Sequence, residues 1–224
     1  AVRFEQAHAV AGLEQRWRAL EALADRPDFL SWPWLATALV GALWRRLARP
    51  WPQALLAVPA PWAAGLGGVG LAMAYAQVQP LLPATPDRAE VEAWFLARAN
   101  STLDYFETDA PPKASRNNLR AWASLAVGEV GVLNRDRGLV EWAILSNNTM
   151  IVNASPDGSL PLEMNRQRYA LHYQLHAMAP LVTSVARICD AGYGKGGADL
   201  EKLQTMARFS VAAVKDPKIV QKIN

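Results

Sequence analysis

Segment 161–180, PLEMNRQRYALHYQLHAMAP, carries an arginine and a tyrosine at a spacing that suits acid–base chemistry. If this segment is helical, Arg166 and Tyr173 are seven residues apart and share one face, two turns apart, with Ala170 between them leaving room for a substrate. Arginine binds a carboxylate through two parallel hydrogen bonds, and tyrosine can exchange a proton. The spacing therefore allows a paired site, although on its own it is more typical of a surface stripe or a helix-packing tyrosine.

Two histidines flank the tyrosine in the same segment. Arg168 and His172 are four residues apart, as are His172 and His176, so each pair would share a helix face. All three side chains are candidate substrate-binding groups. No histidine and carboxylate cluster has the spacing of metal ligands, so no metal or other cofactor is expected.

A second candidate region is SRNNLRAW, residues 115–122, at the start of a predicted helix. Asn117 and Asn118 can direct amide donors, and the free backbone N–H groups of a helix start add positive potential where a carboxylate can sit. Arg120 lies in the same segment and is a further candidate substrate-binding residue. The alternative for the two asparagines is helix capping.

Both regions resemble the poly(β-D-mannuronate) lyase, or alginate lyase, family. That family has an Asn-Asn-His-x-x-Trp stretch, followed downstream by Leu/Pro-x-Glu-Met-x-Arg and Arg-Ala-Leu-x-Tyr-His. This chain has NNLRAW at 117–122 and DGSLPLEMNRQRYALHYQLHAMAPL at 157–181, and the resemblance covers roughly residues 86–190.

The resemblance implies β-elimination on a uronic-acid polymer in an (α/α) toroid. It assigns binding of the substrate carboxylate to Asn118, charge stabilisation to Arg166, and removal and return of the proton to Tyr173. A free tyrosine ionises only near pH 10, so a tyrosine base requires a neighbouring positive charge. The resemblance also implies a periplasmic or secreted protein whose partner is an acidic polysaccharide.

The chain departs from the family pattern at two positions. Leu119 stands where the family has histidine after the second asparagine, and Gln174 stands where histidine follows the tyrosine. Leucine neither donates a hydrogen bond to a carboxylate nor exchanges a proton. His172 and His176 flank Tyr173, but successive helical residues point about 100° apart, which disfavours His172 as a replacement. The alternative function is therefore a catalytically impaired polysaccharide-binding or scaffold relative.

Sugar rings stack on exposed aromatic side chains, which makes the nine tryptophans relevant. Trp32 and Trp34, in the sequence SWPW, are predicted to form a wall of the binding cleft. Trp94, Trp122 and Trp142 lie on apolar helical faces and are predicted to pack in the core.

Apolar periodicity and helix-start signals predict an all-α chain of antiparallel helix pairs, which fits a toroid or an incomplete (α/α)-barrel. At 224 residues, the chain is expected to be a single domain, 1–224, of which 1–60 shows no family pattern. The helices are predicted at 4–25, 34–48, 68–79, 86–106, from 117, and at 139–151, 163–175, 180–191 and from about 198.

Composition limits the remaining function classes. A net charge of +3 suits an anionic ligand but is too small to indicate nucleic acid. Residues 50–86 contain no charged side chain, which makes a membrane-associated helical protein a third interpretation. The dense prolines and glycines in that stretch favour short, buried helices instead. No cleavable signal peptide is recognised at residues 1–10, and no oligomeric state is predicted.

Overall fold

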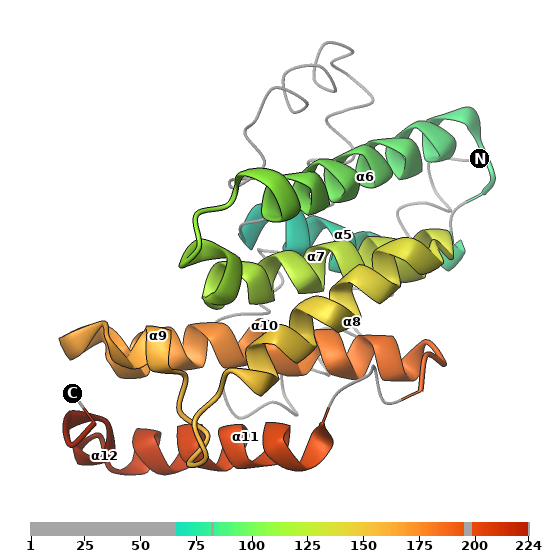
Figure 1. Cartoon of the computed structure of the whole chain (residues 1–224). Helices are drawn as coiled ribbons and strands as arrows, with labels where there is room; N and C mark the ends of the chain where they lie inside the picture. Colours follow the sequence, from blue (N-terminus) through green and yellow to red (C-terminus); the bar gives the residue numbers. More distant parts are fainter. Residues whose placement is uncertain (1–65, 82, 195–198, 224) are drawn as a thin grey trace. The chain divides into compact units, whose positions relative to one another are not determined.

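A computed structural model describes residues 66–81, 83–194 and 199–223, which lie within one compact unit of the chain, Leu55–Asn224 (Figure 1). The predicted helices at 4–25 and 34–48 lie outside these residues, as do Trp32 and Trp34. The single-domain organisation of 1–224 therefore stays a prediction.

The described residues form helices and no β-strand, which confirms the all-α fold class. The main helices are α5 (Leu66–Val78), α6 (Pro86–Asp104), α7 (Asn118–Asn134), α8 (Arg137–Val152), α10 (Ala170–Asp190) and α11 (Leu200–Lys215). Two short α-helices, α9 (Pro161–Met164) and α12 (Lys218–Gln221), and four single turns, η1 (Gln79–Leu81), η2 (Tyr105–Asp109), η3 (Ala114–Arg116) and η4 (Gln167–Tyr169), complete the set.

Side-chain caps define the starts of four of these helices. Thr85 accepts from the Arg88 N–H before α6, and Asn117 accepts from the Leu119 N–H before α7. Asp136 and Asp199 cap α8 and α11 in the same way. Each cap satisfies a backbone donor that the helix itself leaves unpaired, so the capping interpretation of Asn117 is confirmed.

Helix α7 is the centre of the described unit, with α5, α6, α8 and α10 packed around it (Figure 1). It runs antiparallel to α8, and two glycines let these helices approach closely. A Cβ atom at Gly128 would lie 3.0 Å from the Ala143 Cβ, and one at Gly131 would lie 2.9 Å from the Val140 backbone nitrogen. Side chains larger than hydrogen would therefore push α8 away from α7.

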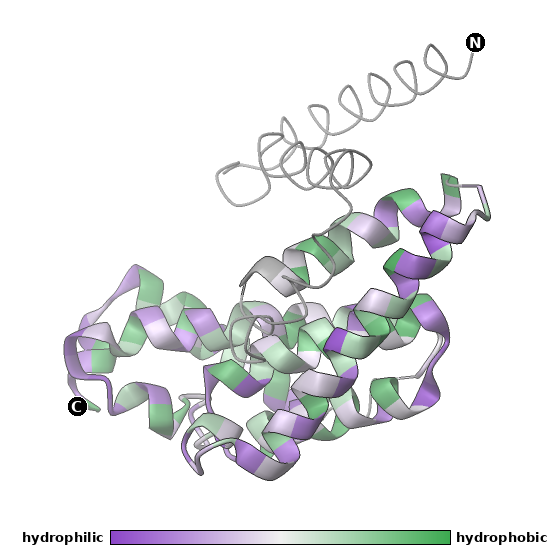
Figure 2. Cartoon of the chain, turned by 90° about the horizontal axis from the view of Figure 1, so that it is seen from above, coloured by the Kyte–Doolittle hydropathy of each residue, from purple (hydrophilic) through white to green (hydrophobic). Residues whose placement is uncertain are grey.

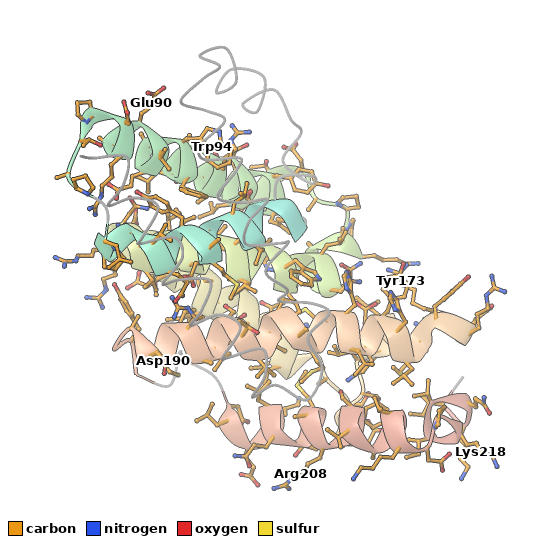
Figure 3. All side chains as sticks on the ribbon, turned by 180° about the vertical axis from the view of Figure 1, so that it is seen from behind. Glu90, Trp94, Tyr173, Asp190, Arg208 and Lys218 are labelled. Carbon is orange, nitrogen blue, oxygen red and sulfur yellow. The ribbon has the colours of Figure 1, made fainter. Side chains whose placement is uncertain are left out.

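Helices α7 and α10 run parallel, so their amino-terminal ends lie on the same side of the unit. Asn118 at the start of α7 bonds Glu163 just before α10, whereas Glu129 near the end of α7 pairs with Arg187 near the end of α10. The candidate site residues that the structure describes lie toward this shared amino-terminal end, while Asp190 marks the opposite end of α10 (Figure 3).

The interface of α7, α8 and α10 contains a buried polar cluster. The Ser124 hydroxyl donates to the Asn147 side-chain oxygen at 2.7 Å, and the Asn147 amide donates to the Ser184 hydroxyl at 2.9 Å. All three side chains are at most 1% exposed. Buried polar groups are stable only when hydrogen-bonded, so this cluster restricts how the three helices can slide against one another.

Two predicted helix boundaries are wrong. The predicted helix 163–175 is interrupted, because Gln167 has a left-handed φ of 54° that separates α9 from α10. The predicted start at Pro180 is also wrong, since Pro180 lies inside α10. A proline there costs the hydrogen bond to the His176 carbonyl, but the buried face continues through Ala177 and Leu181 on either side. Packing therefore overrides the local break.

Ala170 also differs from its prediction. It is fully buried, beside Met164, Phe209 and Ala213, and so leaves no room for a substrate.

The uncharged stretch is only partly described. Val69 and Ala72 of α5 are buried against α6 and α7, which confirms the prediction of a packed helix for that part. Among the residues that the structure describes, no helix is long and apolar enough to cross a bilayer. Figure 2 accordingly shows hydrophilic and hydrophobic residues interspersed along the described helices.

Gly158, in the loop between α8 and α9, is expected to be sensitive to substitution. Its φ is 92°, and an added Cβ would lie 2.6 Å from the Thr205 carbonyl oxygen of α11. Gly158→Ala should therefore lower the free energy of unfolding by about 2 kcal/mol or more, measured by urea denaturation. Gly138→Ala is the matched control, because its nearest contact is 3.4 Å. A loss as large at Gly138 as at Gly158 would contradict the explanation.

Candidate functional site

The Arg166 guanidinium lies over the ring of Tyr173, with its central carbon 4.6 Å from the ring centre. Tyr173 belongs to the first turn of α10 (Figure 3), and Arg166 lies just before η4. The predicted proximity is confirmed, but it does not arise from two turns of one helix. The left-handed φ of Gln167 interrupts the helix between the two residues, and the two side chains are in direct contact.

A buried carboxylate holds this segment against α7. Glu163 is 0% exposed and accepts hydrogen bonds from the Asn118 backbone N–H at 2.7 Å and from its side-chain amide at 3.1 and 3.2 Å. Arg166 supplies a more distant positive charge, 3.8 Å from the carboxylate. The Asn118 amide nitrogen therefore faces a carboxylate of the protein itself, and Asn118 is only 2% exposed.

A pocket of about 220 Å³ opens beside Arg166, lined by Lys113, Asn117, Leu162, Asn165 and Arg166. Lys113 and Arg166 are both exposed, and the two asparagines add amide groups. A pocket with two cationic side chains and no carboxylate in its lining favours an anion.

The two histidines of α10 form an aromatic cluster with Tyr173. The rings of His172 and His176 are stacked, with centres 5.8 Å apart and planes 11° apart. The Tyr173 ring meets His172 edge to face at 5.2 Å and His176 at 6.2 Å. The predicted shared face of His172 and His176 is confirmed.

His176 is held by a tryptophan of α7. The Trp122 indole N–H donates to His176 Nε2 at 3.1 Å, and an indole can only donate. Neutral His176 must therefore carry its proton on Nδ1. Burial, followed by the positive charge of a protonated His172, lowers the pKa of His176 below its ordinary value of 6.5. His176 is consequently neutral at neutral pH.

Arg120 is occupied by contacts within the protein. Its guanidinium donates to Ser146 Oγ at 3.0 Å and to Glu107 at 2.8 Å, and it lies over the Trp142 ring. The Trp142 indole N–H, followed by Arg120, holds the pKa of Glu107 below its usual value despite partial burial. This network joins α7, α8 and η2, and Arg120 does not line the pocket.

Arg168 does not share a helix face with His172, because it lies in η4 before α10 begins. Its guanidinium instead stacks on Tyr169 at 4.6 Å and donates to the Tyr169 hydroxyl at 2.7 Å.

The two departures from the family pattern occupy different environments. Leu119 is 48% exposed at the head of α7. Gln174 is fully buried, where it accepts from the Leu160 N–H and donates to the Gly158 carbonyl oxygen and the Ser210 hydroxyl. Gln174 therefore positions the loop before α9, whereas Leu119 presents an apolar side chain at the head of α7.

Sequence reasoning did not identify Lys113, Asn165 or Glu163 as site residues. Lys113 and Asn165 follow no motif, and only the folded chain brings both of them to one pocket. Glu163 was visible within the Glu-Met-x-Arg pattern, and an acidic residue flanked by apolar ones could have been recognised as a buried acceptor. The predicted packing of tryptophans is confirmed for Trp122 and Trp142, each 7% exposed.

Comparisons with known proteins agree with this arrangement. A family model described as alginate lyase matches residues 67–220. An alginate lyase of Pseudomonas fluorescens (strain Pf-5) is 29% identical over 171 residues, which cover 73% of this chain and 44% of that protein. A polysaccharide lyase of Stenotrophomonas maltophilia (strain K279a) is 38% identical over 113 residues, covering 50% of this chain and 33% of that protein.

Crystallographic relatives show the same fold. Alginate lyase A1-III from Sphingomonas species A1 superposes with a TM-score of 0.60 at 24% identity, covering 73% of this chain and 45% of that one. A tyrosine-to-phenylalanine variant of A1-III, complexed with a tetrasaccharide, gives 0.58 at 23% identity, covering 73% of this chain and 46% of that one.

The described helices thus form part of an (α/α)-toroid domain of the polysaccharide lyase class, as predicted. The chain belongs to the alginate lyase family. It spans less than half the length of the relatives named above.

Removing the Glu163 charge should destabilise the fold. Glu163→Gln replaces one acceptor oxygen with an N–H₂ group that faces the Asn118 donors, so the free energy of unfolding should fall by about 2–3 kcal/mol in urea denaturation. Glu90→Gln on the exposed surface of α6 is the matched control and should change it by less than about 0.5 kcal/mol (Figure 3). Equal effects of the two substitutions would show that the Glu163 bonds contribute nothing specific.

The lowered pKa of His176 predicts a stability that depends on pH. The unfolded chain protonates His176 at a higher pH than the folded chain does. The contribution of neutral His176 to the free energy of unfolding is therefore fully present above the ordinary pKa of 6.5 and is lost as the pH falls toward the lowered pKa of the folded state. His176→Gln keeps an acceptor for Trp122 but does not titrate. Thermal unfolding should therefore show a smaller acid-induced loss in His176→Gln than in the wild type, whereas parallel curves would refute the assignment.

Proposed function

We propose that this protein is a polysaccharide lyase that cleaves an acidic uronic-acid polymer, of the alginate or polymannuronate type, by β-elimination. The observation that carries the proposal is that Arg166, which lines the basic pocket, holds its guanidinium 4.6 Å from the centre of the Tyr173 ring. Family membership supports the same reaction class.

The reaction has three requirements that these residues match. The C5 proton of a uronate is weakly acidic, so the adjacent carboxylate must be neutralised before the proton can leave. Arg166 and Lys113 supply positive charge for that carboxylate. Tyr173, as phenolate, takes the C5 proton, the C4–O bond breaks as the C4–C5 double bond forms, and the tyrosine proton passes to the departing oxygen.

The three catalytic assignments differ in how well the contacts support them. Arg166 and Tyr173 fit their assigned roles, because the guanidinium lies directly over the tyrosine ring and both groups can face one substrate residue. Asn118 fits its assigned role less well, since its amide nitrogen already donates to both oxygens of Glu163. Asn117 and Asn165 line the pocket and are better placed to meet a substrate carboxylate.

A second candidate function is favoured by Leu119. An exposed leucine at the head of α7 removes the imidazole of the family pattern, as expected for a relative that binds an acidic polysaccharide without cleaving it. In either case we propose a periplasmic or secreted location, where such polymers are found.

The test is ultraviolet absorbance of the unsaturated uronic-acid product during incubation with mannuronate, guluronate and glucuronate polymers. Rising absorbance with one polymer is expected. A flat trace with all three, accompanied by polymer binding, would favour the non-catalytic function instead.

Tyr173→Phe should reduce turnover by at least about 100-fold, because the ring remains while the proton-transferring hydroxyl is lost. Tyr169→Phe is a closely matched control, since Arg168 also lies 4.6 Å from the Tyr169 ring centre but, unlike Arg166, does not line the pocket. Full activity in Tyr173→Phe, or an equal loss in Tyr169→Phe, would remove the assigned role.

A further inference from the structure

The head of α7 and the first turns of α10 face a common region. The Trp122 indole on α7 contacts His176 on α10 at 3.1 Å, and the two helices run parallel. Leu119 lies three residues before Trp122, and Tyr173 lies three residues before His176. Leu119 and Tyr173 therefore each lie about one helical turn from the Trp122–His176 contact, on the amino-terminal side of their own helix. Because the helices are parallel, the two residues lie at about the same height along the helix axes.

An imidazole is available at this level in spite of the leucine. His172 is exposed, and its ring contacts Tyr173 edge to face with centres 5.2 Å apart. The 100° offset of neighbouring helical positions does not separate these rings, because both side chains extend far enough from the helix to meet. A uronate whose C5 proton reaches Tyr173 therefore lies within reach of His172.

His176 is less able to meet the substrate itself. It is only partly exposed, its Nε2 atom is occupied by Trp122, and one face of its ring is covered by His172. These contacts instead give His172 a fixed surface to stack on. The near-parallel ring of His176, with its centre 5.8 Å away, supports the His172 ring on the side next to Tyr173.

We propose that His172 is the imidazole that contacts the uronate in this site, in place of the one absent at Leu119, and that His176 is its positioning residue. This inference rests on the proposed function. The His172 ring N–H donates a hydrogen bond to the substrate carboxylate as charge builds at C5, and Tyr173 alone exchanges the proton. No covalent bond to the imidazole forms.

The kinetic test replaces His172 with a side chain that cannot donate. His172→Leu should lower kcat about 100-fold, the usual effect of removing one donor to a developing negative charge. Adding Leu119→His to this variant should restore kcat by at least about tenfold, since it returns a donor to the same region. Arg208→Leu, on the exposed surface of α11, is the control and should keep wild-type activity (Figure 3).

The positioning role of His176 has its own variant. His176→Gln keeps the acceptor for Trp122 but removes the stacked ring, so kcat should fall about tenfold while KM stays unchanged. An unchanged kcat would overturn the positioning role. A kcat in His172→Leu equal to that of the wild type would overturn the assignment of His172.

A binding measurement separates this inference from the lyase function. The chain has three histidines, so their imidazole NMR signals can be assigned from the His172→Leu and His176→Gln variants. A mannuronate oligomer added to Tyr173→Phe protein should shift the His172 signals. Binding that leaves these signals unmoved would overturn the inference, whatever the activity.

The remaining outcomes are also decisive. A His172 shift in a protein that never cleaves the polymer would overturn the lyase proposal and support the histidine contact. A wild-type protein that neither binds nor cleaves any of the three polymers would overturn both proposals.

Discussion

The buried carboxylate of Glu163 is the interaction on which the geometry of the candidate site depends. It accepts from both the backbone and the side chain of Asn118, so the start of α7 and the short helix α9 are fixed to one another. A buried carboxylate that loses its donors costs several kcal/mol, and the two elements therefore cannot separate independently. Arg166 follows Glu163 by three residues, lies 3.8 Å from its carboxylate and stacks over the Tyr173 ring.

The register between α7 and α10 is set farther along the helices by polar contacts. Ser124 and Ser184 meet within the polar cluster, and Arg187 forms a two-point bond with Glu129 at 2.7 and 2.9 Å. Since these contacts are directional, a shift of α10 by one turn would leave buried polar groups unpaired. The encounter of Trp122 with His176, and so the placement of the imidazole pair, follows from this register.

Helices with a clear start and one apolar face could be predicted from the sequence alone. Thr85-Pro86 and Asn117 mark the starts of α6 and α7 within a residue or two, because capping is a local interaction. The interruption at Gln167 and the continuation through Pro180 could not be predicted, since both depend on what the segment packs against. The sequence predicted that Arg166 and Tyr173 share a face with space for a substrate between them, whereas the folded chain places the two side chains in direct contact.

The two departures from the family pattern have unequal consequences. Gln174 is an adequate structural side chain, because its amide can accept from Leu160 and donate to Gly158 at the same time, as the buried loop requires. Leu119 meets no comparable structural need, for it is half exposed and lies outside the buried contacts that fix α7. Under the proposed function, an exposed leucine at this position leaves two alternatives: a protein that binds the polymer without cleaving it, or an imidazole supplied from another position. The edge-to-face contact of the His172 ring with Tyr173 places an imidazole beside the proposed base, which is the arrangement that the second of these alternatives requires.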